Sequence, residues 1–303
     1  MEKLVYAFMA GPDEQEQAVI LVRSIRAFAG ELAECPIWVF APLSIEKLSN
    51  VVQEQLLALN VRLFSFAIEP EALGFTLAAK VYASAQAEAL AKDEAELLAW
   101  LDTDMLVIRE PGEFLLDSDK TLGYHPVHHK LIGSSYAEPL DEYWSLAYEH
   151  CNVPNENVFP MMTHVGNDKI QPYFNAGMLV LRPEKGVFHL WGDNFDRLYR
   201  EPFFEAFYQK HVLYRVFFHQ VILSGSILAA IPQAEMKELS PLINYPLHLI
   251  EEDVSGQRPT KINDLVTCRH ENIFQRPDWE TQFSAEGDLR QWIIEQFNNG
   301  EEQ

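Results

Sequence analysis

Strand-like and helix-like segments alternate along the first hundred residues, and this alternation restricts the possible folds more than any other feature of the chain. Short apolar runs typical of buried strands are separated by stretches of helical length and helical periodicity. Consecutive strand–helix–strand units of this kind predict an α/β fold with a mainly parallel central sheet. The expected strands cover 3–10, 36–42, 61–68 and 96–102, and the expected helices cover 16–30, 44–60 and 76–92.

The second half of the chain is less regular. No linker rich in Gly or Ser separates it from the first half, so we expect one domain, residues 1–303, with two subregions that meet near residue 110. A long loop is expected at 152–172, and loops of that length are often functional. The other expected elements are strands at 120–127 and 173–183 and helices at 140–151, 186–200, 211–224 and 286–299.

The charge of the chain narrows its range of partners. It contains 45 Asp and Glu residues against 23 Lys and Arg residues, which gives a formal net charge of −22. This balance argues against binding of nucleic acid through its phosphates and against docking on anionic membranes. A phosphate-containing ligand would need a local source of positive charge, for which a bound metal ion is one candidate.

The cysteines and the apolar segments indicate the cellular compartment of the protein. Cys35, Cys151 and Cys268 are odd in number, far apart and outside any CxxC motif, so we expect neither a disulfide framework nor a zinc knuckle. No apolar run reaches the roughly 18 residues of a membrane span. The N-terminal segment MEKLVYAFMAGP fits a first strand better than a secretory signal. We therefore expect a cytoplasmic protein with no evident membrane anchor.

Two aspartates interrupt the apolar segment LAWLDTDMLV at 98–107. Asp102 and Asp104 follow the fourth expected strand, at the edge where open α/β sheets bind their ligands. Two carboxylates at this spacing can coordinate one hard cation such as Mg²⁺ or Mn²⁺. Aspartate is also an ordinary turn residue, so the pair alone leaves a solvated turn as the alternative. A second DxD triplet, at 117–119, is expected to be a solvated loop.

Further motifs follow downstream. The segment FNAGMLVLRP begins at Phe174, a His–Gln pair at 219–220 precedes an apolar helical pattern, and IPQAEMKELSPLINYP follows at 231–246. Last comes HENIFQRPDW at 270–279. Together with LDTD, these motifs resemble the GT-A class of nucleotide-sugar glycosyltransferases, most nearly the glycogenin and bacterial galactosyltransferase type. The resemblance spans most of the chain, and the LDxD and FNAG segments match best.

This resemblance implies a GT-A fold with a Rossmann-like N-terminal half, in which residues 1–110 bind the nucleotide and residues 111–303 bind the sugar and the acceptor. It implies a metal-dependent enzyme that moves a sugar from a nucleotide-diphosphate donor to a glycan or another hydroxyl acceptor. Mn²⁺ or Mg²⁺ would be the cofactor, held by Asp102, Asp104 and His270. As a Lewis acid, the ion would stabilise the charge of the diphosphate leaving group.

The resemblance also implies roles for individual residues around the donor. Asp104 would coordinate the metal directly, whereas Asp102 would bind the metal or the ribose. Asn175 and Gly177 would line the sugar pocket, and Gln220 would face the donor sugar or the acceptor. The other implied donor-binding residues are Gly11 near the base, Lys80 at the diphosphate, and Arg276, although Gly11 also fits a simple turn and Lys80 a solvated helix face. Within this set, the expected catalytic residues are Asp104, Asn175 and Gln220.

The sequence departs from the family pattern at three positions. His219 stands in place of an Asp, Ile273 in place of a Gly, and Arg276 in place of a Lys. In the family these positions contact the acceptor and the diphosphate, so the resemblance does not specify the donor sugar or its nucleotide. In the last motif Pro277 keeps its place and Trp279 comes one residue late.

Two other functions are compatible with parts of the sequence. A haloacid-dehalogenase-type phosphatase also places DxD after an apolar strand, and WGDNFD at 191–196 superficially resembles its acidic fourth motif. That DxD normally opens the fold, however, and WGDNFD lies in a helical pattern. The second alternative is a carbohydrate-binding protein that has lost catalysis. It is favoured by the three departures and disfavoured by the intact pair of Asp102 and Asp104.

The histidine-rich segment YHPVHH suggests a rival metal site at His125, His128 and His129. On a strand this spacing divides the side chains between two faces, so we expect a surface or acceptor-cleft cluster instead. Histidine and aromatic side chains together could line an acceptor-sugar cleft. The aromatic candidates are Tyr136, Tyr143 and Trp144.

Overall fold

The computed structural model describes residues 1–276 and 278–297, and a seven-stranded sheet lies at the centre of this described part. Neighbouring strands are parallel except around β9, which runs antiparallel to both β4 and β6. The expected α/β fold with a mainly parallel sheet is therefore confirmed, with one reversed strand. The strand order is β10 (Met236–Glu238), β6 (Leu122–Tyr124), β9 (Met178–Leu181), β4 (Leu98–Leu101), β1 (Val5–Met9), β2 (Ile37–Pro42) and β3 (Val61–Phe66).

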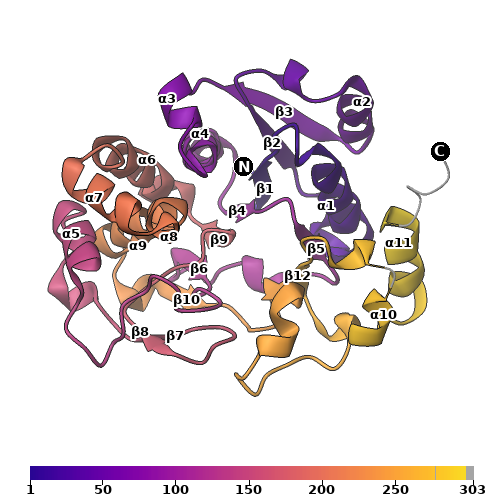
Figure 1. Ribbon diagram of the computed structural model, residues 1–303. Coiled ribbons are helices and arrows are strands. Elements are labelled where there is room, and N and C mark those ends of the chain that lie inside the picture. Colours follow the sequence, from indigo (N-terminus) through magenta and orange to yellow (C-terminus); the bar gives the residue numbers. More distant parts are fainter. Residues whose placement is uncertain (277, 298–303) are drawn as a thin grey trace.

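Helices cover both faces of this sheet, with the helices of residues 78–230 gathered on one side of it and the first two on the other (Figure 1). The division follows from strand alternation, because Val5 and Ala7 of β1 face one apolar cluster and Tyr6 and Phe8 face the other. Within residues 1–276 and 278–297, no helix is long and apolar enough to cross a membrane. One face carries α1 (Gln15–Phe28) and α2 (Asn50–Ala58), and the other carries α4 (Ala78–Glu94), α5 (Glu142–His150), α6 (Val187–Leu198), α7 (Pro202–Lys210) and α9 (Phe218–Ala230).

Two expected helices are divided in the structure. The segment 44–60 forms a 3-10 turn at Ile45–Lys47 followed by α2. Two serines cause this division, because each accepts a hydrogen bond that starts a new helical segment. Ser44 accepts from the backbone of Glu46, and Ser49 accepts from that of Val52. The segment 211–224 likewise becomes α8 (Val212–Val216) and the first part of α9, and α7 forms where the sequence analysis predicts no helix.

A smaller sheet brings the C-terminal part of the chain to the end of β4 (Figure 1). β5 (Met105–Val107) follows β4 after a short turn and pairs antiparallel with β12 (Thr267–Arg269), which also pairs with β11 (Tyr245–Pro246). A third apolar cluster joins this sheet to α10 (Trp279–Gln282) and α11 (Gly287–Phe297). Residues 298 and 299 of the expected last helix lie outside the described residues. The remaining elements are α3 (Pro70–Leu73), β7 (Met161–Met162) and β8 (Lys169–Ile170).

The expected boundary near residue 110 does not divide the main sheet. Strands β1 to β4 come from before this point, and β6, β9 and β10 come from after it. The assignment of 1–110 to the nucleotide and 111–303 to the sugar and acceptor stays a prediction.

Candidate functional site

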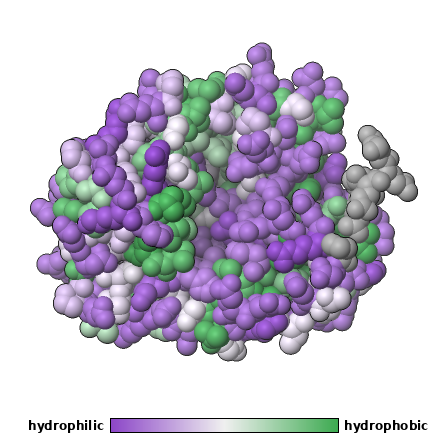
Figure 2. All heavy atoms as spheres, in the orientation of Figure 1, coloured by the Kyte–Doolittle hydropathy of each residue, from purple (hydrophilic) through white to green (hydrophobic). Residues whose placement is uncertain are grey.

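A pocket of about 400 Å³ opens beyond the end of β4, at the carboxyl edge of the main sheet. Figure 2 shows this face of the molecule hollowed near its centre, with mostly hydrophilic residues on one side of the hollow and an apolar group on the other. Segments far apart in the sequence form the pocket walls, including the start of α1, α4, the turn after β4, the segment before β9, α9 and the end of β12. The lining residues used below are Glu14, Lys80, Asp102, Asp104, Asn175, Gly177, His219, Gln220, Arg269 and Glu271.

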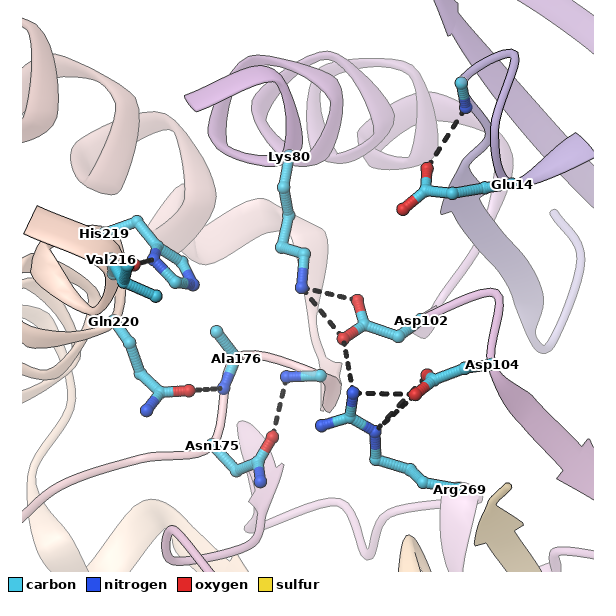
Figure 3. A network of polar contacts seen from close by, with 12 residues as sticks. Glu14, Lys80, Asp102, Asp104, Asn175, Ala176, Val216, His219, Gln220 and Arg269 are labelled. Carbon is cyan, nitrogen blue, oxygen red and sulfur yellow. Dashed lines mark hydrogen bonds and ion pairs between the residues drawn. The ribbon is translucent and has the colours of Figure 1, made fainter. Parts of the chain in front are cut away.

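The two aspartates of the DxD motif lie in the turn between β4 and β5 and point into the pocket (Figure 3). The backbone holds this turn on both sides. The N–H of Asp102 donates to the carbonyl of Gly177 over 2.8 Å, and the N–H of His270 donates to the carbonyl of Asp104 over 2.9 Å. The predicted position of the pair, where the fourth strand ends, is confirmed.

Each of these carboxylates is paired with a cationic side chain (Figure 3). Lys80 Nζ lies 2.6 Å from Oδ1 and 2.8 Å from Oδ2 of Asp102. Arg269 donates from Nη2 to Oδ2 of Asp104 over 2.8 Å, and its Nε lies 3.1 and 3.3 Å from the two oxygens of that carboxylate. Arg269 Nη2 is also 3.9 Å from Oδ2 of Asp102, so the guanidinium is near both aspartates.

The electrostatic environment keeps this network charged. Burial by itself raises the pKa of Asp104, but the charge and the hydrogen bonds of Arg269 outweigh it, so that the pKa lies below its usual value. Burial lowers the pKa of Arg269, and the charges of Asp104 and Asp102 more than reverse this effect. Both partners therefore stay ionised at neutral pH.

The expected third metal ligand, His270, does not join the two aspartates. Its ring packs against Phe274 and Phe297, with ring centroids 5.7 and 5.0 Å away, and it lines a separate pocket beside α1. Successive residues of an extended segment point to opposite sides, so Arg269 faces the aspartates and His270 faces away. Burial lowers the pKa of His270 to about 4.

The carboxylates therefore do not fit a divalent ion in this arrangement. In the described part of the chain, no three His, Cys, Asp or Glu side chains are grouped so that they could hold a metal. The predicted ligand set of Asp102, Asp104 and His270 is not assembled. The oxygens of the two aspartates face Lys80 and Arg269 instead.

The FNAG segment forms the pocket wall next to the aspartates. Asn175 Oδ1 accepts from the N–H of Gly177 over 2.8 Å, and Asn175 Nδ2 lies 3.1 Å from His128 Nε2. Gln220, near the start of α9, accepts from the N–H of Ala176 through Oε1 over 2.9 Å. The structure thus brings Asn175, Gly177 and Gln220 to one pocket, while their contact with a sugar stays a prediction.

Gly177 stands where the backbone passes close to charged groups. A Cβ atom at this position would lie 2.9 Å from Oδ2 of Asp102 and 2.9 Å from Oδ1 of Asn175. It would also lie 3.4 Å from Nη1 of Arg269. A side chain at this position would therefore force the side chains of Asp102 and Asn175 to shift.

The other expected donor-binding residues do not line this pocket. The N–H of Gly11 donates to the lining residue Glu14 over 3.2 Å, and burial raises the pKa of that glutamate. Arg276 is exposed and Pro277 lies outside the described residues. Ile273 is buried in the apolar cluster below β12.

His219, which replaces the family's Asp, is a buried neutral side chain of the pocket. Its Nδ1 lies 3.0 Å from the carbonyl of Val216. Burial lowers its pKa to about 3, and the charge of Lys80 acts in the same direction. The negative charge expected at this position in the family is therefore absent here.

A second pocket of about 460 Å³ adjoins the first. It shares a wall with the first pocket, namely Asn175, Phe217, Gln220, Arg269 and Glu271. Its far side carries His128, His129 and His248. Part of the expected histidine cluster therefore lines a cleft beside the first pocket, and none of these histidines belongs to a metal-binding group in the described residues.

The remaining members of the expected acceptor cleft lie elsewhere. His125 is buried and stacks on His164 at 5.2 Å between ring centroids. Tyr143 and Trp144 belong to the core, where they donate to the carbonyls of Tyr214 and Ile132. The predicted lining by these aromatic residues is wrong, because their face of α5 packs against α7, α8 and the segment before β9. Tyr136 lines a different hollow.

The sequence analysis missed Arg269 as a member of the site. The residue stands directly before His270 in the last motif, and strand alternation would have shown that only one of the two can face the aspartates. Glu14 and Glu271 were also missed, because acidic residues are too common in this chain to stand out.

The mixed α/β fold of this chain is similar to that of solved glycosyltransferases. A solved complex of the galactosyltransferase LgtC with donor and acceptor sugar analogs superposes with a TM-score of 0.51 at 13% identity, covering 95% of this chain and 99% of that one. An active-site mutant of LgtC gives 0.50 at 14%, with the same coverage. The bifunctional glycosyltransferase WbbM gives 0.52 at 14% identity, covering 98% of this chain and 50% of that one.

The family follows from the sequence itself. A family model described as the Rhodobacterales glycosyltransferase domain matches residues 5–228. The chain belongs to this family and is a glycosyltransferase with a GT-A fold. No curated protein matches the sequence. The phosphatase alternative is not supported, since WGDNFD lies inside α6 rather than at the end of a strand.

Proposed function

We propose that this glycosyltransferase takes its sugar from a nucleotide-diphosphate donor bound in the first pocket and passes it to a hydroxyl group of an acceptor, such as a glycan, bound in the second. The observation that carries the proposal is the shared wall between the two pockets. Asn175 and Gln220 line both of them, so a donor sugar and an acceptor hydroxyl can meet there without either ligand leaving its pocket.

The charges of the first pocket suit a diphosphate leaving group. As the glycosidic bond breaks, negative charge develops on the diphosphate, and fixed cations nearby stabilise it. Lys80 and Arg269 supply positive charge, and Asp102 and Asp104 hold these two side chains in place. In this proposal the aspartates act chiefly through the cations they orient.

The other predicted residues are given a role in this proposal only where they line the first pocket. Asn175 and Gln220 can bond sugar hydroxyls through their amide groups, and Gly177 allows close approach of the ligand to the backbone. Gly11 and Arg276 are left out of the donor pocket, because neither lines it. The Mn²⁺ or Mg²⁺ expected from the sequence is not part of this proposal, because its three predicted ligands are not assembled.

A thermal-shift screen of UDP-sugars and GDP-sugars tests the donor. At least one of them should raise the melting temperature of the wild type, and Asp104→Asn should abolish the shift because Arg269 loses its partner. The matched control is Asp119→Asn, which changes an exposed aspartate of the second DxD triplet, outside the pocket. A screen without any shift, or a shift that Asp104→Asn leaves intact, would refute the proposed donor site.

A further inference from the structure

The guanidinium of Arg269 lies beside both aspartates, where it contacts Asp104 and comes close to Asp102 (Figure 3). Its Nη2 lies 2.8 Å from Asp104 Oδ2 and 3.9 Å from Asp102 Oδ2. Lys80 Nζ contacts both oxygens of Asp102. All four carboxylate oxygens of the DxD pair therefore already have a cationic neighbour within the protein.

The charge of the pair is balanced without any added ion. Two carboxylates carry two negative charges, and Lys80 and Arg269 carry two positive ones. An arginine cannot lose its proton in a protein, so Arg269 cannot vacate the position by becoming neutral. A divalent ion at the same oxygens would have to displace the guanidinium or lie beside it, and like charges a few ångströms apart repel strongly in a partly buried site.

The backbone also directs Arg269 into this position. β12 pairs antiparallel with β5, and its register sets Arg269 opposite Met105, directly after the DxD turn. The next residue, His270, is bonded through its N–H to the carbonyl of Asp104. The base of the Arg269 side chain is thus held by sheet hydrogen bonds, and Gly177 leaves room beside its Nη1.

We propose that Arg269, together with Lys80, takes the place of the divalent cation at the DxD pair, so that this enzyme binds the diphosphate of its donor without a metal ion. Arg269 uses Nε and Nη2 for Asp104, and Nη1 points away from the carboxylates into the pocket (Figure 3). Guanidinium groups bind phosphate oxygens well. The first part of this inference, that Arg269 and Lys80 replace a divalent ion at the two aspartates, concerns the carboxylates alone. The second part, that the diphosphate binds without a metal ion, rests on the proposed donor.

Binding of Mn²⁺ alone, followed by electron paramagnetic resonance, tests the first part. The wild type should show only the weak binding of a very acidic surface, within about twofold of Asp104→Asn. Arg269→Ala should gain a site at least about tenfold tighter than any in the wild type, and the added change Asp104→Asn should remove it. The control is Arg62→Ala, which removes an exposed arginine paired with Glu94.

Two results would overturn this part of the inference. One is a wild-type Mn²⁺ site that disappears in Asp104→Asn. The other is a folded Arg269→Ala protein that gains no site. If Arg269→Ala does not fold, Arg269→Met replaces it, and the comparison of wild type with Asp104→Asn still decides the question.

Calorimetric titration with UDP and GDP tests the second part. The dissociation constant of the nucleotide that binds wild type should agree within about twofold between EDTA and Mn²⁺ buffers. In Arg269→Ala it should weaken at least about tenfold in EDTA and recover with Mn²⁺. Wild-type binding that requires Mn²⁺ contradicts metal-independent donor binding. If neither nucleotide binds in either buffer, both the proposed donor and the second part of the inference are wrong. The Mn²⁺ titration still tests the first part of the inference, because it needs no nucleotide.

Discussion

Gly177 is a residue at which one added carbon should disturb the whole polar network. Its Cβ would lie 2.9 Å from an oxygen of Asp102 and from one of Asn175, so both side chains would have to move. Overpacking of this kind costs about 1–3 kcal/mol. We expect Gly177→Ala to lower the free energy of unfolding by an amount in this range and to weaken nucleotide binding, measured by urea denaturation and titration.

A second glycine provides the control for this substitution. A Cβ on Gly112 would have no neighbour within 4 Å, so Gly112→Ala should leave nucleotide binding unchanged. If both variants behave alike, the close approach at Gly177 does not restrict the site.

Individual residues of the site could be predicted where a motif marks them. Asp102 and Asp104 stand at the end of a buried strand, and Asn175 and Gly177 open the next sequence motif that the family shares. Arg269 could not be found in this way, because its role depends on the register between β5 and β12, two strands more than 150 residues apart. His270 was misassigned for the same reason, since the motif contains the residue but does not reveal which way its side chain points.

At the scale of elements, Glu88 connects α4 to the first turn of α6. Its Oε2 accepts from the N–H of His189 over 2.8 Å, and the side chain is only 2% exposed. Burial is the largest influence and raises the pKa of Glu88 to about 7, against the lowering effect of these helix N–H groups. The carboxyl group thus keeps its proton to a higher pH than an exposed glutamate does.

This raised pKa predicts how stability depends on pH. The folded state binds the proton more tightly than the unfolded state does, whose pKa lies near 4.5. The free energy of unfolding should therefore fall as pH rises from about 4.5 to about 7. Because one pKa unit corresponds to about 1.4 kcal/mol, the contribution of Glu88 is on the order of 3 kcal/mol.

Substitution of Glu88 isolates this contribution. Glu88→Gln keeps a hydrogen-bond acceptor for α6 but cannot ionise, so the fall in stability between pH 5 and 7 should be shallower by about 2 kcal/mol. Urea denaturation at several pH values measures it. Asp93→Asn, on the exposed side of α4, is the control and should retain the wild-type slope. An unchanged slope in Glu88→Gln would show that burial does not raise this pKa.

The elements themselves could be predicted best where the pattern is periodic and the strands are parallel. All four strands of the first hundred residues form where predicted, since each is an apolar run between helices. The reversal of β9 could not be predicted, because an apolar run has the same pattern in either direction. The division of 44–60 into two segments depends on Ser44 and Ser49. The sequence analysis missed α7 although Phe204 and Phe207 are buried on one side of it and Glu205, Gln209 and Lys210 are exposed on the other.

For the molecule as a whole, the excess of acids contrasts with the balanced charges of the first pocket. The chain carries 45 acidic residues against 23 Lys and Arg residues. Lys and Arg are too few to pair with all of these acids, so the carboxylates in excess repel one another across the surface. The pairs at Asp102 and Asp104 are partly buried and are screened much less by salt than exposed charges are. Salt should therefore act on the surface while leaving the pocket network in place.

This contrast determines the sign of the salt effect on stability. The Debye length is about 30 Å at 0.01 M and about 8 Å at 0.15 M ionic strength, so added salt removes repulsion among distant acids. Salt also weakens exposed ion pairs such as Lys261–Glu286, but pairs of this kind stabilise a protein only slightly. We expect the melting temperature to rise between 10 and 150 mM NaCl, measured by circular dichroism. KCl should act equally, because screening depends on ionic strength alone, and a fall in melting temperature would mean that attractive surface pairs outweigh the net charge of −22.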